Sequence, residues 1–478
     1  MTLDFESCYR ALASRDRRFD GRFFVGVRTT GIYCRPVCKA KLPARTSCTF
    51  YATHEGAEAA GYRPCKLCRP ELAPGGAPVD AVGDLARTAL TLIRHGALDE
   101  GSVASLASEL GTSVRHLNRS LVQEIGAGPL RIALTRRLLL AKRLLTDTDL
   151  PVGEVAMAAG FGSLRRFQAA FREHYRLSAS EWRRGKAGLR DGRLALELSY
   201  RPPYRWEPMI AYLAARALPG VETVRDGKYF ATMRLGSHVG WIAVSPGTGD
   251  ALRLEVSEGL IPALGRVIPR VRNRFDLDAD PLAIAEALGS LAEGREGTRL
   301  PGALNPFETA VRAVLGQQVT VGQATMLTGK VAALFGEPMP EGSPEGLDRT
   351  FPTPAVLAER TRDDIASLGM PGARACTLIA FAQAVASGAV RLATGAHLEE
   401  TEAALSQIAG FGPWTKAYIG LRALSDPDAF PVGDAGLAKA LGTRSPKEMA
   451  RIAERWRPWR GYAAILLWEH AAEGTIPP

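Results

Sequence analysis

Apolar positions at helical spacing dominate the chain from about residue 80 to residue 186. One predicted helix places four apolar residues on a single face: Val103, Leu106, Ala107 and Leu110. Gly111 then turns the chain, and Thr112 is placed to cap a second helix that runs towards Ile125. Two short helices joined by a tight turn predict a helix-turn-helix.

The same pattern occurs a second time further along. Val152 and Val155 precede the turn Gly160-Phe161-Gly162, and a further helix is predicted from Ser163 to Tyr175. A long apolar helix around Leu130–Leu145 lies between the two pairs. The sequence therefore predicts a double helix-turn-helix.

Beyond Arg193 the periodicity changes from helix to strand. Leucines alternate with other residues in Leu194–Leu198, and two further alternating segments, 241–244 and 252–256, predict a strand pair. A helix is predicted over Ile210–Leu218, and helical periodicity returns from Pro281 to the end.

The pattern predicts a multidomain α+β protein. Pro74–Pro78 and Gly185–Gly192 have the composition of linkers. We expect a small α/β domain over residues 1–74 and an all-α helix-turn-helix domain over 79–186. A small antiparallel sheet with helices is expected over 193–280, and an all-α domain over 281–478.

Composition and charge narrow the partners. The chain has 478 residues, too many for one core. Residues 1–190 contain 30 Lys+Arg against 18 Asp+Glu, whereas the rest contain 30 against 32. A basic front half favours a nucleic-acid partner. The sequence has no apolar run of membrane length and no apolar signal core at its start, so we expect no membrane span and a cytoplasmic location.

Four of the seven cysteines form two close pairs. Cys34 and Cys38 are followed by Cys65 and Cys68, a spacing that suits a tetrahedral zinc ion. From spacing alone, a purely structural zinc site is the more common interpretation. The odd number of cysteines argues against a disulfide framework.

A second candidate site lies near the carboxyl end. Gly410 and Gly412 interrupt two predicted helices, the second starting at Thr415, as in a helix-hairpin-helix that presents backbone N–H groups to a DNA phosphate. Asp434 follows in a Gly/Pro-shaped loop. A lone Asp in such a loop is usually a turn or cap residue.

The residues around the cysteines resemble those of the Ada family. The matching segments are Arg28–Tyr33 before the first pair and Ala60–Pro64 before the second. The resemblance implies a zinc-bound Cys34 that accepts a methyl group from a DNA methyl phosphotriester, and phosphate contacts by Thr30, Arg45 and Arg63.

The double helix-turn-helix resembles the AraC type, through Ala159–Ser163 and the Phe167/Phe171 pair. Its recognition helices would read DNA bases in the major groove. The candidate contacts are Arg115, His116, Asn118, Arg165, Arg166 and Gln168.

From about Leu194 to Ile476 the chain resembles the AlkA type of 3-methyladenine DNA glycosylase, in the helix-hairpin-helix superfamily. The matching segments include 202–206, 300–302, 312–317, 368–371 and 453–460. The resemblance implies that Asp434 supports cleavage of the glycosidic bond, with Trp414, Tyr418 and Trp468 as the base pocket. Superfamily members that also cut the strand carry a Lys where Trp414 stands, so we expect base release only.

The same resemblance implies several DNA contacts around the hairpin. Gln318 occupies the place of the wedge that fills the vacated base stack, and Lys416 is expected to contact a phosphate. Gly410, Gly412 and Thr415 would complete the hairpin's phosphate site. A monovalent cation or Mg2+ at the hairpin is expected from the resemblance only.

The sequence thus predicts a DNA alkylation-repair protein with a sacrificial methyl acceptor, a transcription activator and a glycosylase. The alternative is a non-enzymatic, damage-responsive regulator whose last domain only grips DNA. No Pro-Cys-His-Arg motif of the O6-methylguanine acceptors occurs, so we expect no repair of that lesion. Double-stranded DNA and RNA polymerase are the expected partners, and a monomer is the expected state.

Overall fold

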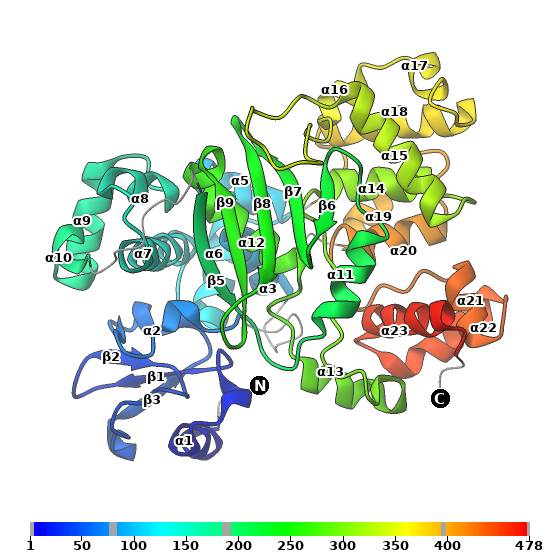
Figure 1. Cartoon of the computed structure of the whole chain (residues 1–478). Coiled ribbons are helices and arrows are strands. Elements are labelled where there is room, and N and C mark those ends of the chain that lie inside the picture. The colour runs from blue at the N-terminus through cyan, green and yellow to red at the C-terminus, as the bar shows by residue number, and fades with distance from the viewer. Residues whose placement is uncertain (1–3, 76–83, 184–192, 393–397, 476–478) are drawn as a thin grey trace. The chain divides into compact units, whose positions relative to one another are not determined.

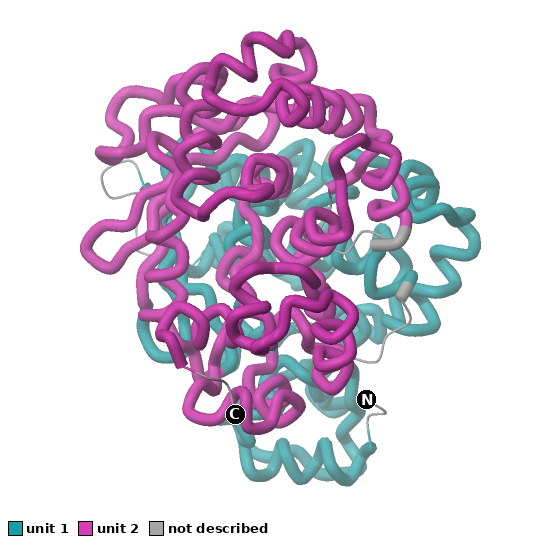
Figure 2. The backbone as a smooth tube through the Cα atoms, turned by 90° about the vertical axis from the view of Figure 1, so that its right-hand side faces the viewer, with its two compact units in different colours: residues 1–201, 247–272, 277–279 teal, residues 202–246, 273–276, 280–478 magenta. Residues whose placement is uncertain are grey.

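The protein is represented by a computed structural model that describes residues 4–75, 84–183, 193–392 and 398–475 (Figure 1). Its backbone contacts divide the chain into two units, shown in Figure 2. Unit 1 contains residues 1–201, 247–272 and 277–279, and unit 2 contains the remaining residues. The two predicted linkers lie largely outside the described residues.

A four-stranded sheet forms the start of unit 1, in the order β3-β1-β2-β4. Strand β1 is antiparallel to both of its neighbours, whereas β2 and β4 are parallel. The elements are α1 (Phe5–Ser14), β1 (Phe24–Val27), β2 (Ile32–Cys34), β3 (Cys48–Tyr51), α2 (His54–Ala59) and β4 (Arg63–Pro64).

The predicted double helix-turn-helix is present in unit 1. Its helices are α3 (Asp84–Arg94), α4 (Ala97–Glu100), α5 (Val103–Glu109), α6 (Val114–Ile125), α7 (Pro129–Asp147), α8 (Val152–Ala158), α9 (Leu164–Tyr175) and α10 (Ala179–Trp182). One expected cap was wrong. Ser113, and not Thr112, caps α6, because its side chain accepts a hydrogen bond from the His116 amide at 3.2 Å.

The five strands after Arg193 have the order β5-β9-β8-β7-β6. They are β5 (Arg193–Ser199), β6 (Glu222–Arg225), β7 (Lys228–Leu235), β8 (His238–Pro246) and β9 (Ala251–Ser257), accompanied by α11 (Trp206–Ala214) and α12 (Leu264–Arg274). The three leucines of β5 are buried, as the alternation predicted. The helix expected over Ile210–Leu218 instead starts at Trp206 and ends at Ala214.

The rest of unit 2 is helical and packs around an apolar core that includes Phe307, Phe381 and Ile419. Its helices are α13 (Pro281–Leu288), α14 (Pro306–Leu315), α15 (Val321–Phe335), α16 (Pro354–Ala358), α17 (Arg362–Ala366), α18 (Gly372–Ala386), α19 (Leu398–Ser406), α20 (Pro413–Arg422), α21 (Ala435–Leu441), α22 (Pro446–Ala453) and α23 (Arg460–Glu473). Helix α20 starts at Pro413, two residues before the predicted Thr415, because Pro suits the first helical position. The fold class is the one predicted.

Candidate functional sites

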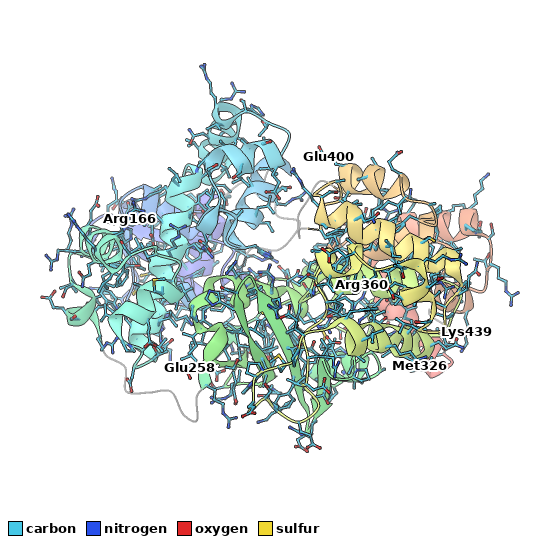
Figure 3. The ribbon with its side chains drawn as sticks, turned by 90° about the horizontal axis from the view of Figure 1, so that it is seen from above. Arg166, Glu258, Met326, Arg360, Glu400 and Lys439 are labelled. Carbon is cyan, nitrogen blue, oxygen red and sulfur yellow. The ribbon has the colours of Figure 1, made fainter. Side chains whose placement is uncertain are left out.

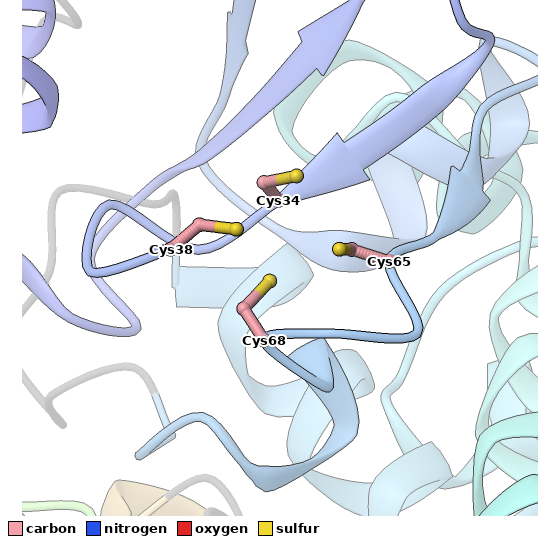
Figure 4. A group of neighbouring side chains, drawn as sticks. All are labelled: Cys34, Cys38, Cys65 and Cys68. Carbon is pink, nitrogen blue, oxygen red and sulfur yellow. The ribbon is translucent and has the colours of Figure 1, made fainter. Parts of the chain in front are cut away.

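The four paired cysteines converge at the edge of the first sheet. Cys34 ends β2 and Cys65 follows β4, and the parallel pairing of these strands brings the two residues together. Cys38 and Cys68 lie on the loops that follow, and the four Sγ atoms are all within 4.8 Å of one another (Figure 4). Four clustered thiols are a donor set that fits Zn2+.

Arg35 holds the two cysteine loops together. Its backbone N–H donates to Cys68 Sγ at 3.3 Å, and its Nη1 donates to the Cys68 carbonyl oxygen at 3.1 Å. The same guanidinium forms an ion pair with Asp20. These contacts fix Cys68 relative to Cys34, so the sulfur cluster does not depend on a metal alone for its shape.

Crowding of the thiols changes their acidity. A hydrogen bond from Cys34 is the main cause that lowers the pKa of Cys38 to about 7, and the same kind of contact lowers the pKa of Cys65. Thiolates are the form that binds metal and attacks carbon. Contacts with the other three cysteines raise the pKa of Cys34, and for Cys68 the lowering by Cys34 is outweighed by the contacts with Cys38 and Cys65, which raise its pKa. The four thiols therefore differ in how readily they lose a proton.

A buried chain of polar contacts links Cys34's strand to the second recognition helix. The Tyr33 hydroxyl, one residue before Cys34, donates to Glu58 Oε1 at 2.9 Å. The other carboxylate oxygen of Glu58 lies 3.0 Å from His174 Nε2 in α9. Glu58 is fully buried, so both contacts are shielded from water.

The three expected phosphate contacts of the zinc domain differ in their surroundings. Thr30 and Arg63 are exposed. Arg45 is also exposed, but it pairs with Glu6 and its guanidinium carbon lies 4.8 Å from the centre of the Tyr9 ring. A phosphate would have to draw Arg45 away from these partners.

The two recognition helices present the expected polar faces. Leu117 and Leu121 bury one side of α6, and Phe167 and Phe171 bury one side of α9. The opposite faces expose all six predicted DNA-contacting residues: Arg115, His116, Asn118, Arg165, Arg166 and Gln168. Arg166 is labelled in Figure 3.

The hairpin between α19 and α20 requires its first glycine. Gly410 has φ of +94°, and a Cβ atom there would lie 2.6 Å from the Thr377 hydroxyl oxygen. Gly412 is the residue that precedes α20. The turn thus leaves the first amides of α20 free of a side-chain cap.

The loop after α14 is tied to this hairpin. Gln317 Nε2 donates to the Gly410 carbonyl oxygen at 2.8 Å and to Thr415 Oγ1 at 2.9 Å. Arg374 donates to the Gln317 carbonyl oxygen at 2.7 Å. The next residue, Gln318, is exposed with φ of +57°, an unusual backbone conformation for a residue other than glycine.

Asp434 caps α21 and accepts from two indole rings. Its Oδ1 accepts from the amides of Gly436 at 2.9 Å and Leu437 at 3.1 Å, and from Trp468 Nε1 at 2.8 Å. Its Oδ2 accepts from Trp414 Nε1 at 3.1 Å. The carboxylate therefore faces the aromatic residues with both oxygens fixed.

The three predicted pocket aromatics lie together. Trp414 and Tyr418 stack with ring centres 5.1 Å apart, and Tyr418 and Trp468 are 6.2 Å apart and tilted. All three side chains are only half-buried. Gly436 makes room for Trp468, since a Cβ at this glycine would lie 2.9 Å from Trp468 Cδ1.

Lys416 points along the hairpin towards α19. Its Nζ donates to Ser406 Oγ at 2.9 Å and lies 3.3 Å from Glu402 Oε1. Both partners belong to α19. The residue at the start of α20 that contacts Asp434 is Trp414, through its indole N–H.

The sequence interpretation missed a second set of residues beside the aromatics. The Tyr212 ring of α11 lies between two guanidinium groups, with Arg216 at 3.7 Å and Arg422 at 4.8 Å from its centre. The only sequence signal was the Tyr/Arg spacing of four residues within a predicted helix. Arg422 comes from a segment about 200 residues away, which no local pattern links to Tyr212.

A four-cysteine metal site, two DNA-reading helix pairs and a hairpin followed by a fixed Asp define a multidomain protein of DNA repair and its regulation. Four family models match: the metal binding domain of Ada over residues 7–71, a helix-turn-helix domain over 106–185, the AlkA N-terminal domain over 195–305 and the HhH-GPD superfamily base excision DNA repair protein over 311–458.

The chain belongs to the family of bifunctional transcriptional activator/DNA repair enzymes of the AlkA type. It is 39% identical to the probable bifunctional transcriptional activator/DNA repair enzyme AlkA of Mycobacterium tuberculosis (strain ATCC 25618 / H37Rv) over 482 residues, which cover 97% of this chain and 96% of that protein.

Two relatives from Escherichia coli (strain K12) match separate parts. DNA-3-methyladenine glycosylase 2 is 37% identical over 272 residues, covering 57% of this chain and 95% of the relative. The bifunctional transcriptional activator/DNA repair enzyme Ada is 49% identical over 65 residues, covering 14% of this chain and 18% of the relative.

No helix among the described residues is long and apolar enough to cross a membrane.

Proposed function

We propose that this chain repairs alkylated DNA by two chemistries and uses the first of them to control transcription. The observation that carries the proposal is the pairing of two prepared reactive groups: a cluster of four sulfurs, and a carboxylate held among aromatic rings. The first would accept methyl groups, and the second would support base excision.

In the glycosylase half, Asp434 stabilises the transition state of base release. Cleavage of the N-glycosidic bond builds positive charge on the sugar, and a carboxylate nearby offsets that charge and orients the attacking water. Trp414, Tyr418 and Trp468 supply ring faces for a flipped, positively charged purine such as 3-methyladenine or 7-methylguanine. Because no Lys replaces Trp414, the reaction ends at base release.

The hairpin and the Gln318 loop hold the DNA. The first amides of α20 with Thr415 suit a backbone phosphate, and Lys416 adds a positive charge nearby. Gln317 links this grip to the loop of Gln318, whose exposed side chain would enter the gap left by the flipped base. The cation expected at the hairpin stays a prediction from resemblance.

In the front half, the Cys34 thiolate attacks the methyl carbon of a phosphotriester. The new S–C bond forms as the C–O bond breaks, and the electron pair leaves on the phosphate oxygen, which becomes an ordinary diester anion. Cys34, Cys38, Cys65 and Cys68 would hold Zn2+, which would keep the attacking sulfur deprotonated. The thioether is not reversed, so each chain accepts one methyl group.

Methylation also removes one negative charge from the face that meets DNA. The methylated protein then binds DNA more strongly, and its two recognition helices bind a specific sequence. Repair of the lesion thereby becomes the signal for transcription. RNA polymerase is the expected partner in activation. The chain is expected to act as a monomer on double-stranded DNA.

Base release from methylated DNA tests the glycosylase half. Asp434→Asn should lower the release rate at least about 100-fold, the scale of losing a key electrostatic group. Wild-type release without loss in the variant would remove Asp434 from the mechanism. No release by the wild type would favour the alternative, a regulator that only grips DNA.

Mass spectrometry after exposure to DNA with methyl phosphotriesters tests the front half. One methyl group should appear on Cys34, and Cys34→Ser should abolish its uptake. Cys376→Ser is the matched control, since Cys376 is exposed and outside the sulfur cluster. A methyl group on another cysteine would contradict the assignment.

A further inference from the structure

The loop between α14 and α15 is held less by its own backbone than by other elements. The Gln317 amide reaches the Val314 carbonyl oxygen at 3.5 Å. The Val319 amide reaches the Gly316 carbonyl oxygen at the same distance. Both distances are longer than the usual range for such bonds, which makes the bonds weak. The shape of the loop therefore depends on the contacts that Gln317 makes elsewhere.

The Gln317 side chain ties this loop to the hairpin between α19 and α20. Its Nε2 donates to the Gly410 carbonyl oxygen at 2.8 Å and to Thr415 Oγ1 at 2.9 Å. A carbonyl oxygen only accepts, so the nitrogen of the Gln317 amide, and not its oxygen, must face the hairpin. Gly410 belongs to the turn and Thr415 to the first turn of α20, so one side chain contacts both parts of the proposed phosphate site.

Helix α18 supports the loop and the hairpin together. Arg374 Nη2 donates to the Gln317 carbonyl oxygen at 2.7 Å. Thr377 Oγ1 donates at 3.0 Å to the carbonyl oxygen of Ala409, the residue before Gly410. Residues three apart share a face of a helix, so one surface of α18 holds both elements.

The carbonyl group of Gln317 also sets the backbone at Gln318. It lies in the same peptide plane as the Gln318 N–H, so the bond from Arg374 fixes the orientation of that plane. Gln318 then has φ of +57°, a conformation that costs a residue other than glycine free energy and persists where its surroundings enforce it. Its side chain is exposed. The strained residue is thus the one that presents its side chain to solvent.

We propose that Gln317 is a positioning residue that couples the hairpin's hold on a DNA phosphate to the insertion of Gln318 into the base stack. Phosphate bound at the hairpin steadies the Gly410 carbonyl group and Thr415, and Gln317 carries this restraint into the peptide that precedes Gln318. The orientation of Gln318 is then set before the base leaves the stack, which lowers the entropy cost of insertion. The inference rests on the proposed glycosylase function and assigns the residue that makes base flipping depend on the phosphate contact.

A double-mutant cycle tests this coupling. Gln317→Met keeps the length of the side chain but removes its N–H donors, and Gln318→Ala removes the proposed wedge. Release of 7-methylguanine from duplex DNA is followed in single turnovers at saturating protein, so that differences in DNA binding do not enter. Each single change should lower the rate about fivefold or more, the scale of one lost hydrogen bond. The double variant should be no slower than the slower single variant, because Gln317 acts through Gln318.

Gln383→Met is the matched control. The Gln383 Nε2 also donates to a backbone carbonyl oxygen, that of Ala358 at 3.3 Å, but this bond involves neither the hairpin nor the loop. The release rate of this variant should stay within about twofold of the wild-type rate. Thermal unfolding is measured for every variant. Gln317→Asn keeps the amide on a shorter side chain and should reproduce the loss if Gln317→Met does not fold.

The outcomes distinguish the inference from the function on which it rests. Losses that multiply in the double variant would show that Gln317 and Gln318 act independently, and the inference would be overturned. It is overturned as well if a folded single variant of either residue releases the base at the wild-type rate. If the wild-type chain itself releases no base, the proposed glycosylase function fails, and the inference fails with it.

Discussion

Asp434 is both a helix-cap residue and the carboxylate of the candidate site, two roles that the sequence alone left as alternatives. It is a helix cap, as most loop aspartates are, and it is also the carboxylate that the aromatic residues surround. Its four contacts all come from N–H donors. An Asn at this position would turn its amide N–H2 towards some of these donors, so Asp434→Asn changes hydrogen bonding as well as charge.

Gly436 offers a sharper test of geometry than Asp434 itself. Gly436→Ala should lower base release about tenfold, because the new Cβ would lie 2.9 Å from Trp468 Cδ1 and push the indole away from Asp434. Alanine also favours the helix, so the thermal midpoint should not fall in parallel. Release rates and thermal unfolding are measured on the same preparation, and an unchanged rate would contradict the role of the Trp468 contact.

Single residues could be predicted where a motif surrounds them. The four cysteines and Asp434 stand at fixed spacings within recognisable turns, so their neighbourhood was visible in the sequence. Tyr212 could not be found this way. Its place between Arg216 and Arg422 exists only after distant helices have packed.

At the level of elements, a buried ion cluster joins β6 to the helices of unit 2. Glu222 of β6 pairs with Arg274 at 2.5 Å and with Arg312 of α14 at 2.6 Å. Burial alone would raise the pKa of Glu222, but the two guanidinium groups lower it to about 2. The cluster therefore fastens the sheet to the helical core through charge.

This cluster predicts a loss of stability in acid. A carboxylate with a lowered pKa stabilises the fold above its unfolded pKa of 4.5, and that contribution is lost as the pH falls towards 2. The contribution is roughly 3 kcal/mol at neutral pH. Denaturant unfolding of unit 2 between pH 6 and pH 3 should show a steeper loss in the wild type than in Glu222→Gln. Burial raises the pKa of Glu308, so this second carboxyl group affects the pH dependence of stability in the opposite direction. The prediction is therefore tested by comparing the wild type with Glu222→Gln. Parallel curves would contradict the prediction.

Element types followed from the sequence better than element ends. Strands β5, β8 and β9 of the second sheet and the four helices of the two helix-turn-helix motifs were predicted from periodicity, whereas β6 and β7 were not predicted. The cap of α6 and the start of α20 were misplaced by one and two residues, because neighbouring residues compete for the same cap and only backbone angles decide between them.

For the whole molecule, the two proposed reactive groups belong to different units. Cys34 lies in unit 1, whereas Asp434 and the aromatic pocket lie in unit 2. Removing zinc with a strong chelator should therefore abolish methyl uptake by Cys34 while base release stays within about twofold of the untreated rate. Both activities are measured before and after treatment, and zinc is then restored. Loss of base release on chelation would contradict the independence of the two sites.

The indole hydrogen bonds to Asp434 also set a limit on selectivity. Because both N–H groups are committed to the carboxylate, the rings of Trp414 and Trp468 present flat surfaces and little that can read a base edge. The proposed base pocket would therefore accept many purines that are flat and positively charged. Discrimination against undamaged nucleotides would then depend on how slowly the glycosidic bond of each base breaks. Slow excision of undamaged guanine is the expected consequence of a broad lesion range.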